Sequence, residues 1–129
     1  MIDHIGIAVS DYERSKAFYA RVLAPLGYAL VHEVTAAMTG GKDSHAGFGL
    51  ERRPQFWIQT GDVVRGTLHV AFAANTRAQV DAFHLAALGA GATDHGAPGL
   101  RPHYHPNYYG AFVLDPDGHN IEAVCHTPE

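Results

Sequence analysis

The chain repeats itself at an interval of 65 residues, and this repeat constrains the fold more than any other feature. Residues 4–9, HIGIAV, return as residues 69–74, HVAFAA. Both segments alternate small or polar residues with apolar ones, a period of two that indicates a β-strand. Phe83 stands 65 residues after Phe18, in the pattern that follows each strand. Two copies of one strand–helix unit predict two similar modules in one chain.

Each copy of the repeat continues into an expected amphipathic helix. After the first strand, Ser10 and Glu13 have the spacing of a capping box. Apolar residues then recur at helical spacing from Phe18 to Leu26. In the second copy the same spacing is found for Val80, Phe83, His84 and Ala87. A glycine follows each predicted helix, as is common at helix ends.

Three shorter extended segments follow each helix. They are expected near residues 28–34, 45–50 and 55–59 in the first half, and near 92–95, 108–114 and 120–125 in the second. The last two are joined by Asp-Pro-Asp-Gly at 115–118, a typical turn sequence because proline presets φ and glycine allows a positive φ. We therefore predict an α+β fold, a single domain over residues 1–129, with one βαβββ module at about 1–64 and another at about 65–129.

Composition limits the classes of function. A chain of 129 residues that is 47% hydrophobic and 17% charged is typical of one globular domain. No apolar run approaches the roughly 18 residues of a membrane span, and no signal-peptide pattern precedes the first strand. A net charge of −4 with nine lysines and arginines disfavours nucleic acid. A single cysteine excludes an internal disulfide. We expect a cytoplasmic protein with a small-molecule substrate and no membrane or nucleic-acid partner.

Two histidines and a glutamate share one face of the predicted strands. His4 and His69 begin equivalent strands, Glu122 lies on the last strand, and the neighbours on this face are small. Two imidazoles and a carboxylate form the facial triad of divalent metal sites, which leaves positions open for substrate. These ligands suit Fe(II), Mn(II), Ni(II), Co(II) or Zn(II) and do not choose among them. The alternative for each residue is an ordinary core or surface position.

Residues 101–109, RPHYHPNYY, concentrate side chains that can exchange protons. Two prolines favour an extended segment. The candidate catalytic residues here are His103, His105, Tyr108 and Tyr109. Arg101 is a candidate for binding an acidic group of the substrate. The alternative is a surface loop with exposed rings.

These segments resemble the vicinal oxygen chelate superfamily, which includes glyoxalase I, extradiol dioxygenases, and bleomycin and fosfomycin resistance proteins. The resemblance covers essentially the whole chain and rests on residues 4–19, 68–72 and 112–122, the last containing Asp-Pro-Asp-Gly-x-x-Ile-Glu. It implies two βαβββ modules that form a half-open mixed β-sheet cup with helices outside. It also implies a metal bound by His4, His69 and Glu122, and a homodimer.

One position departs from the glyoxalase I pattern. Relatives of that kind place a fourth ligand, a glutamate, in the last strand of the first module, where the 65-residue interval puts Trp57. An indole is not an ordinary metal ligand. If Trp57 faces the cavity it would form a stacking wall for a flat substrate; otherwise it is a core aromatic. The three-ligand pattern is closer to that of the extradiol dioxygenases.

We therefore predict a metal-dependent enzyme that acts on a small substrate with adjacent oxygens, with dioxygenase-like activity favoured. With a redox-inert metal, glyoxalase-like isomerase or lyase chemistry is the alternative. A non-catalytic binding protein of the bleomycin-resistance type is a third possibility. Such proteins generally lack the intact triad, which counts against this reading.

Overall fold

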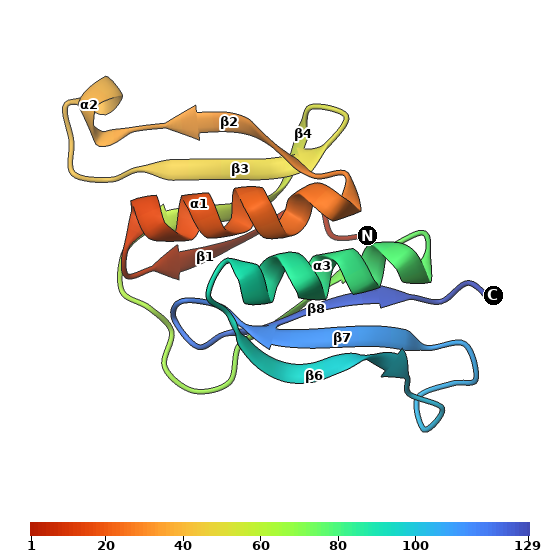
Figure 1. The fold of residues 1–129 in the computed structure, drawn as a ribbon. Helices are drawn as coiled ribbons and strands as arrows, with labels where there is room; N and C mark the ends of the chain where they lie inside the picture. Colours follow the sequence, from red (N-terminus) through yellow and green to blue (C-terminus); the bar gives the residue numbers. More distant parts are fainter.

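The computed structural model describes residues 1–129 as two four-stranded sheets covered by helices (Figure 1). The elements of the first half are β1 (Ile5–Val9), α1 (Tyr12–Leu23), the 3-10 helix η1 (Ala24–Leu26), β2 (Ala29–Val34), α2 (Ala36–Thr39), β3 (His45–Leu50) and β4 (Arg53–Thr60). Those of the second half are β5 (His69–Ala73), α3 (Arg77–Gly89), β6 (Thr93–Leu100), β7 (Tyr109–Leu114) and β8 (Asn120–Cys125). The βαβββ order occurs twice, with the short helices η1 and α2 added. The predicted α+β fold class is confirmed.

The two sheets have equivalent strand orders, β1-β4-β3-β2 and β5-β8-β7-β6. In each sheet the first and last strands of the module pair in parallel, and the other neighbours are antiparallel. Gly6 pairs with Trp57 in the first sheet, and Ala71 pairs with Glu122 in the second. Because each member of the second pair stands 65 residues after its counterpart, the sequence repeat is also a repeat of strand register.

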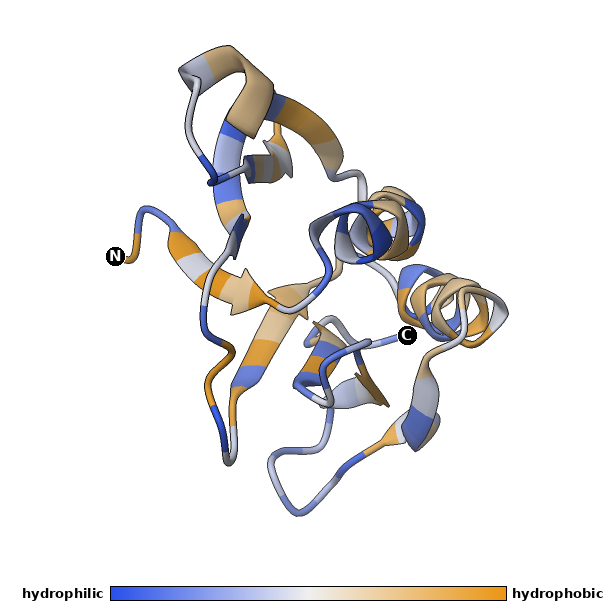
Figure 2. Cartoon of the chain, turned by 90° about the vertical axis from the view of Figure 1, so that its left-hand side faces the viewer, coloured by the Kyte–Doolittle hydropathy of each residue, from blue (hydrophilic) through white to orange (hydrophobic).

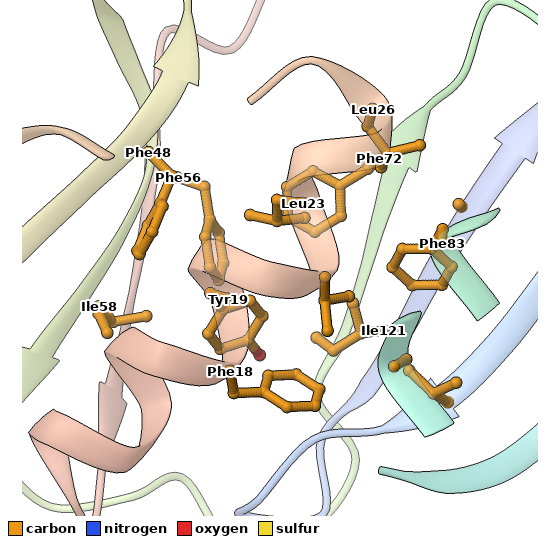
Figure 3. Close-up of a cluster of buried hydrophobic side chains, with 14 of the residues drawn as sticks. Phe18, Tyr19, Leu23, Leu26, Phe48, Phe56, Ile58, Phe72, Phe83 and Ile121 are labelled. Carbon is orange, nitrogen blue, oxygen red and sulfur yellow. The ribbon is translucent and has the colours of Figure 1, made fainter. Parts of the chain in front are cut away.

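Helices α1 and α3 lie side by side and cover one face of the two sheets (Figures 1 and 2). The hydrophobic core between helices and sheets is shared by both modules (Figure 3). The ring of Tyr19 in α1 lies 4.9 Å from that of Phe56 in β4, and Phe56 lies 5.1 Å from Phe72 in β5. Each fully buried aromatic side chain contributes about 1.5–3 kcal/mol. The helices thus close one face of each sheet, and the opposite faces stay open.

The start of α1 differs from the prediction. The N-cap is Asp11, whose carboxylate accepts a hydrogen bond from the backbone N–H of Arg14 at 3.1 Å. The predicted capping box of Ser10 and Glu13 is wrong, because the extended Asp11 places its own carboxylate over the first turn. The Ser10 hydroxyl instead donates to Asp117 of the second module.

No helix in the structure has the length and apolar surface needed to cross a membrane.

The turn between β7 and β8 forms hydrogen bonds that hold the second module against the first. The buried carboxylate of Asp115 accepts hydrogen bonds from the Tyr19 hydroxyl at 2.5 Å and from the backbone N–H groups of Asp117 and His119, both at 2.9 Å. Burial, and then the nearby Asp115 charge, raise the pKa of Tyr19 well above its ordinary value, so its hydroxyl remains a donor. The Asp-Pro-Asp-Gly sequence therefore makes a contact between modules as well as a turn.

The two-residue loop between β3 and β4 is strained. Glu51 and Arg52 both have positive φ, 50° and 65°, as in a type I′ turn. Such a backbone costs a residue with a Cβ about 1–2 kcal/mol. We expect Arg52→Gly to raise the free energy of unfolding by about 1 kcal/mol in urea denaturation. The control Lys42→Gly, at a position without positive φ, should bring no gain, and an equal gain there would contradict the strain argument.

Glu33 of β2 connects an outer strand of the first sheet to α1. Its carboxylate accepts hydrogen bonds from the Lys16 ammonium at 2.8 Å and from the Tyr12 hydroxyl at 2.7 Å. The Lys16 contact and then the Tyr12 contact lower the pKa of Glu33 below its ordinary value of 4.5. A carboxyl with a lowered pKa stabilises the fold above its unfolded-state pKa. This contribution is lost as the pH falls through the folded-state pKa.

We expect Glu33→Gln to lower the free energy of unfolding by about 1 kcal/mol at neutral pH. The loss should be smaller at about pH 3.5, where protonation has already removed the wild-type charge. Urea denaturation at both pH values measures the difference. Glu13→Gln is the matched control, because Glu13 is exposed and lies 3.4 Å from Lys16. Equal losses for Glu33→Gln at the two pH values would rule out the charged contact as the cause.

Candidate metal and substrate site

His69 and Glu122 meet on the open face of the second sheet, and we refer to them as the ligand pair. His69 begins β5, Glu122 lies on the neighbouring β8, and the His69 Nε2 is 3.0 Å from the Glu122 Oε1. The other ring nitrogen, Nδ1, is 3.0 Å from the backbone carbonyl of Asn120. A carbonyl only accepts hydrogen bonds, so Nδ1 carries a proton and Nε2 faces the carboxylate. Nε2 and the carboxylate oxygen that it faces can both act as metal ligands.

The chemistry and separation of the ligand pair fit one divalent ion. Two donors bound at about 2.1 Å and at right angles lie about 3 Å apart. A backbone carbonyl on the second ring nitrogen is a usual orienting partner of a metal-bound histidine. Imidazole and carboxylate together suit first-row divalent metals. The ligand pair therefore has the properties of part of a metal site.

The Glu122 carboxylate is held in place from several sides. It is 1% exposed, and the Tyr108 hydroxyl donates to its second oxygen, Oε2. Gly110 leaves room for it, since a Cβ there would lie 3.1 Å from Oε2. The Phe112 ring stacks on that of His69 at 6.1 Å. Burial and then the Glu122 hydrogen bond raise the pKa of Tyr108 well above its ordinary value of 10, so the hydroxyl is a donor at neutral pH.

His4, the third predicted ligand, does not join the ligand pair in this structure. Its Nδ1 is 2.6 Å from Asp3, and both side chains are largely exposed. The structure contains no group of three or more His, Cys, Asp and Glu side chains that could hold a metal ion. His4 and His69 nevertheless border the same cavity of about 380 Å³. The three-ligand site stays a prediction, of which the structure brings two members into contact.

Trp57 lies on the open face of the first sheet, at the position equivalent to Glu122 in the second. It lines a hollow of about 590 Å³ together with His4 and Gly6. Its ring lies 5.7 Å from that of His32 at an angle of 69°. The indole offers an aromatic surface at this position and no oxygen or imidazole ligand.

The loop before β7 directs its two tyrosines to opposite faces of the second sheet. Tyr108 reaches Glu122 on the open face, whereas the Tyr109 hydroxyl donates to Asp81 of α3 at 2.7 Å. Adjacent residues of an extended chain point to opposite sides, which explains the difference. The Asp81 contact raises the pKa of Tyr109. Of the two, only Tyr108 touches a predicted metal ligand, whereas Tyr109 contacts α3; catalytic roles for both stay predictions.

The two histidines of this loop do not contact the ligand pair. The Nε2 of His105 lies 2.7 Å from the Nδ1 of His126, and its Nδ1 accepts a hydrogen bond from the Asn107 backbone at 3.1 Å. His103 packs against the exposed ring of Tyr104 with centroids 4.3 Å apart. Catalytic roles for His103 and His105 stay predictions.

Arg101 lies beside the ligand pair without touching it. Its guanidinium donates to the backbone carbonyls of Gly99 and Ala97 at 2.8 and 2.7 Å. It also lies over the ring of Phe112, 5.5 Å from the centroid. Arg101 thus supports the aromatic ring that stacks on His69. Its role in binding substrate stays a prediction.

Sequence reasoning missed two histidines that line the hollow beside Trp57, His32 and His45. Alternation along the strand does place Gln59 on the face of Trp57, where the structure has it. The available signal was the surplus of histidine, ten in 129 residues. A surplus carries no positional information, because the face that each strand residue occupies depends on register and bulges.

Two comparisons with known proteins, with a family model and with solved structures, agree with this architecture. A family model described as the Glyoxalase/Bleomycin resistance protein/Dioxygenase superfamily matches residues 1–123. A glyoxalase/bleomycin resistance protein from Albidiferax ferrireducens T118 is 30% identical, with a TM-score of 0.78 over 95% of this chain and 97% of that chain. No curated protein matches the chain.

More distant structures share the fold. Glyoxalase I from Zea mays is 23% identical, with a TM-score of 0.69; the match covers 96% of this chain but 45% of that one, so this chain spans less than half of the maize protein. The fosfomycin resistance protein FosX from Listeria monocytogenes, complexed with Mn(II) and sulfate, is 18% identical, with a TM-score of 0.70 over 98% of this chain and 93% of that chain. Since the family model covers nearly all of these residues, the chain belongs to the Glyoxalase/Bleomycin resistance protein/Dioxygenase superfamily.

Proposed function

We propose that this protein is a metal-dependent enzyme that acts on a small substrate with adjacent oxygen atoms, with dioxygenase-like chemistry favoured over isomerase or lyase chemistry. The observation that carries the proposal is the ligand pair. His69 presents Nε2 to a buried carboxylate at 3.0 Å while Asn120 orients its other nitrogen. A buried carboxylate and an oriented imidazole are what a divalent metal requires.

His69 and Glu122 would hold the metal, with His4 as the third ligand from the far side of the shared cavity. The family provides precedent, since the FosX structure contains Mn(II). When bound, a divalent ion polarises oxygen atoms of the substrate and stabilises negative charge on them. Any of Fe(II), Mn(II), Ni(II), Co(II) and Zn(II) suits these ligands.

The residues around the ligand pair would orient the substrate and a proton. The Tyr108 hydroxyl holds one Glu122 oxygen in place and supplies a proton at the edge of the site. The Phe112 ring, supported by the Arg101 guanidinium, limits movement of His69. Trp57 would form an aromatic wall on the opposite sheet. Each of these groups would hold the substrate or a metal ligand in a fixed position. Positioning of this kind provides much of an enzyme's rate enhancement.

We also propose that two copies of the chain pair. Each sheet is open and has two edge strands, β1 and β2 in the first and β5 and β6 in the second; β1 and β5 are the edges beside His4 and His69. Free edges of this kind are covered or paired in most proteins. A second copy that contacts these edges would also limit solvent access to His4 and His69. A cytoplasmic location remains a prediction from the sequence.

One structural feature favours a second candidate function, non-catalytic binding of a small molecule. Three metal-binding side chains are not assembled in the chain, while an aromatic hollow is already formed beside Trp57. A protein that only sequesters a ligand needs the hollow and not the metal. The two functions differ in whether a metal is bound.

Metal analysis tests the proposal. The protein is purified without chelator, its metal content is measured, and chelator-treated protein is titrated with Fe(II), Mn(II), Ni(II), Co(II) and Zn(II). We expect about one metal per chain and, with Fe(II), uptake of oxygen in the presence of catechols. Metal binding without oxygen uptake would favour isomerase or lyase activity. Failure to bind any of the five metals would overturn the proposal in favour of a binding protein.

A further inference from the structure

The open face of the first sheet carries a set of polar side chains in strand register. Pairing of β2, β3, β4 and β1 aligns them in two neighbouring rows, His32–Gly47–Trp57–Gly6 and Val34–His45–Gln59–Ala8. All of these side chains project away from α1, since they alternate with core residues such as Phe56 and Ile58. The register alone therefore gathers two imidazoles, an indole and an amide on one surface.

These side chains line the hollow of about 590 Å³, with His4 at its edge. The lining contains three imidazoles and no carboxylate, lysine or arginine. The side chains of His32, His45 and Gln59 have no hydrogen-bond partner within the protein, although each carries N–H groups. The hollow therefore offers unused donors, and the carboxylate bound to its edge, that of Asp3, is paired with His4.

Glycine lets the indole lie close to the sheet. A Cβ on Gly47 would come within 3.0 Å of the six-membered ring of Trp57 and within 2.8 Å of Pro54. The indole thus packs over Gly47 of β3, and any larger residue at position 47 would displace it. His32 meets the ring edge-on, with centroids 5.7 Å apart. The result is an aromatic surface bordered by N–H donors.

We propose that this surface binds a planar aromatic carboxylate. The ring of the ligand would stack against Trp57, and its carboxylate would accept hydrogen bonds from His32, His45 and Gln59. Aromatic stacking selects a flat ring, and hydrogen bonds from N–H groups to an ionised acceptor are stronger than those to a neutral one.

This inference rests on the proposed function, because it names the substrate class of the same site. His4 borders both the hollow and the cavity that contains His69. An aromatic acid anchored at Trp57 would therefore extend its remaining substituents toward the ligand pair. The carboxylate would provide affinity at one end, and adjacent oxygens at the other end would meet the metal.

Trp57 is the only tryptophan of the chain, so its fluorescence reports on the surroundings of this indole, and the variants below identify the side on which a ligand binds. Chelator-treated wild-type protein is titrated with benzoate, with benzamide and with cyclohexanecarboxylate, and binding is followed by Trp57 emission and by calorimetry. We expect saturable binding of benzoate. Benzamide lacks the charge and cyclohexanecarboxylate lacks the flat ring, so each should bind at least about tenfold more weakly.

Variants identify the groups responsible. His32→Phe and His45→Phe keep a ring but remove the N–H donors, and each should weaken benzoate binding about tenfold and benzamide binding by less, because the neutral carbonyl is the weaker acceptor. Gln59→Leu tests the amide in the same way. The control is His95→Gln, an exposed histidine of β6 outside the hollow. Circular dichroism of each variant shows whether it is folded.

Benzoate binding no tighter than that of benzamide, or unchanged in folded His32→Phe and His45→Phe, would overturn the inference. The measurements use metal-free protein, so they do not depend on the ligand pair. If benzoate binds as expected but no metal does, the proposed enzyme fails and the binding surface remains. If metal binds stoichiometrically but benzoate does not, the substrate class is wrong and the metal site remains.

Discussion

Glu122→Gln is expected to bind Mn(II) or Fe(II) more than about 100-fold more weakly than the wild type. The substitution preserves the shape of the side chain and removes the negative charge that an ion requires. The variant should still unfold cooperatively, because the amide can accept the Tyr108 hydrogen bond and a buried charge is removed. Metal titration of chelator-treated protein, with a thermal melt of the same sample, measures both effects.

Three further variants make this result specific. His69→Ala should lose metal to the same extent, because His69 is the other member of the ligand pair. Glu13→Gln, an exposed carboxylate of α1, should bind metal as the wild type does. His4→Ala decides whether His4 completes the site, which the structure leaves as a prediction. Wild-type metal affinity in Glu122→Gln would contradict the assignment of Glu122 as a ligand.

Asp115→Ala is expected to lower the free energy of unfolding by about 3 kcal/mol and the melting temperature by about 10 °C. The carboxylate is buried and accepts hydrogen bonds from the Tyr19 hydroxyl and two backbone N–H groups. Alanine would leave these three donors without a partner, and each unsatisfied buried donor costs about 1–3 kcal/mol. Urea and thermal denaturation measure the loss.

Two neighbouring substitutions test the cause of that loss. Tyr19→Phe removes only the donor from α1, so it should destabilise the protein by about 1–2 kcal/mol. Asp117→Asn changes an exposed contact with Ser10 and should cost less than either. If Asp115→Ala melted like the wild type, the hydrogen bonds between the turn and α1 would not stabilise the pairing of the modules.

Together these variants separate two uses of the C-terminal motif. Asp115 holds the turn against α1, whereas Glu122, seven residues later, faces the opposite side of the second sheet. We expect Asp115→Ala to lower the stability while metal binding stays intact. We expect Glu122→Gln to weaken metal binding while the stability stays intact.

Local patterns were sufficient to predict most of the secondary structure. The period of two in residues 4–9 and 69–74, the helical spacing after them and the Asp-Pro-Asp-Gly turn depend on interactions between near neighbours in sequence. The structure has strands, helices and a turn at these places. The Ser10–Glu13 capping box failed because two adjacent residues could cap the helix, and the contact of Ser10 with distant Asp117 was not visible in sequence.

The repeat carried information about the site as well. The 65-residue interval predicted that Trp57 and Glu122 occupy equivalent positions, and the strand register places both opposite small residues of the neighbouring strand. It could not predict that Tyr108 reaches Glu122 while Tyr109 points to α3. The face that each tyrosine occupies depends on how the loop enters β7, and this is determined by the packing of the second sheet.

Periodicity and internal repetition are local or one-dimensional properties, so they were enough to predict the two modules, the faces of the regular strands and the equivalence of Trp57 with Glu122. Which side chains meet depends on tertiary packing. A register shift between Leu30 and His32 turns His32 toward Trp57, and no alternation rule could have located it. The pairing of β5 with β8 joins His69 to Glu122, which are far apart in the chain, whereas His4 contacts its sequence neighbour Asp3 instead.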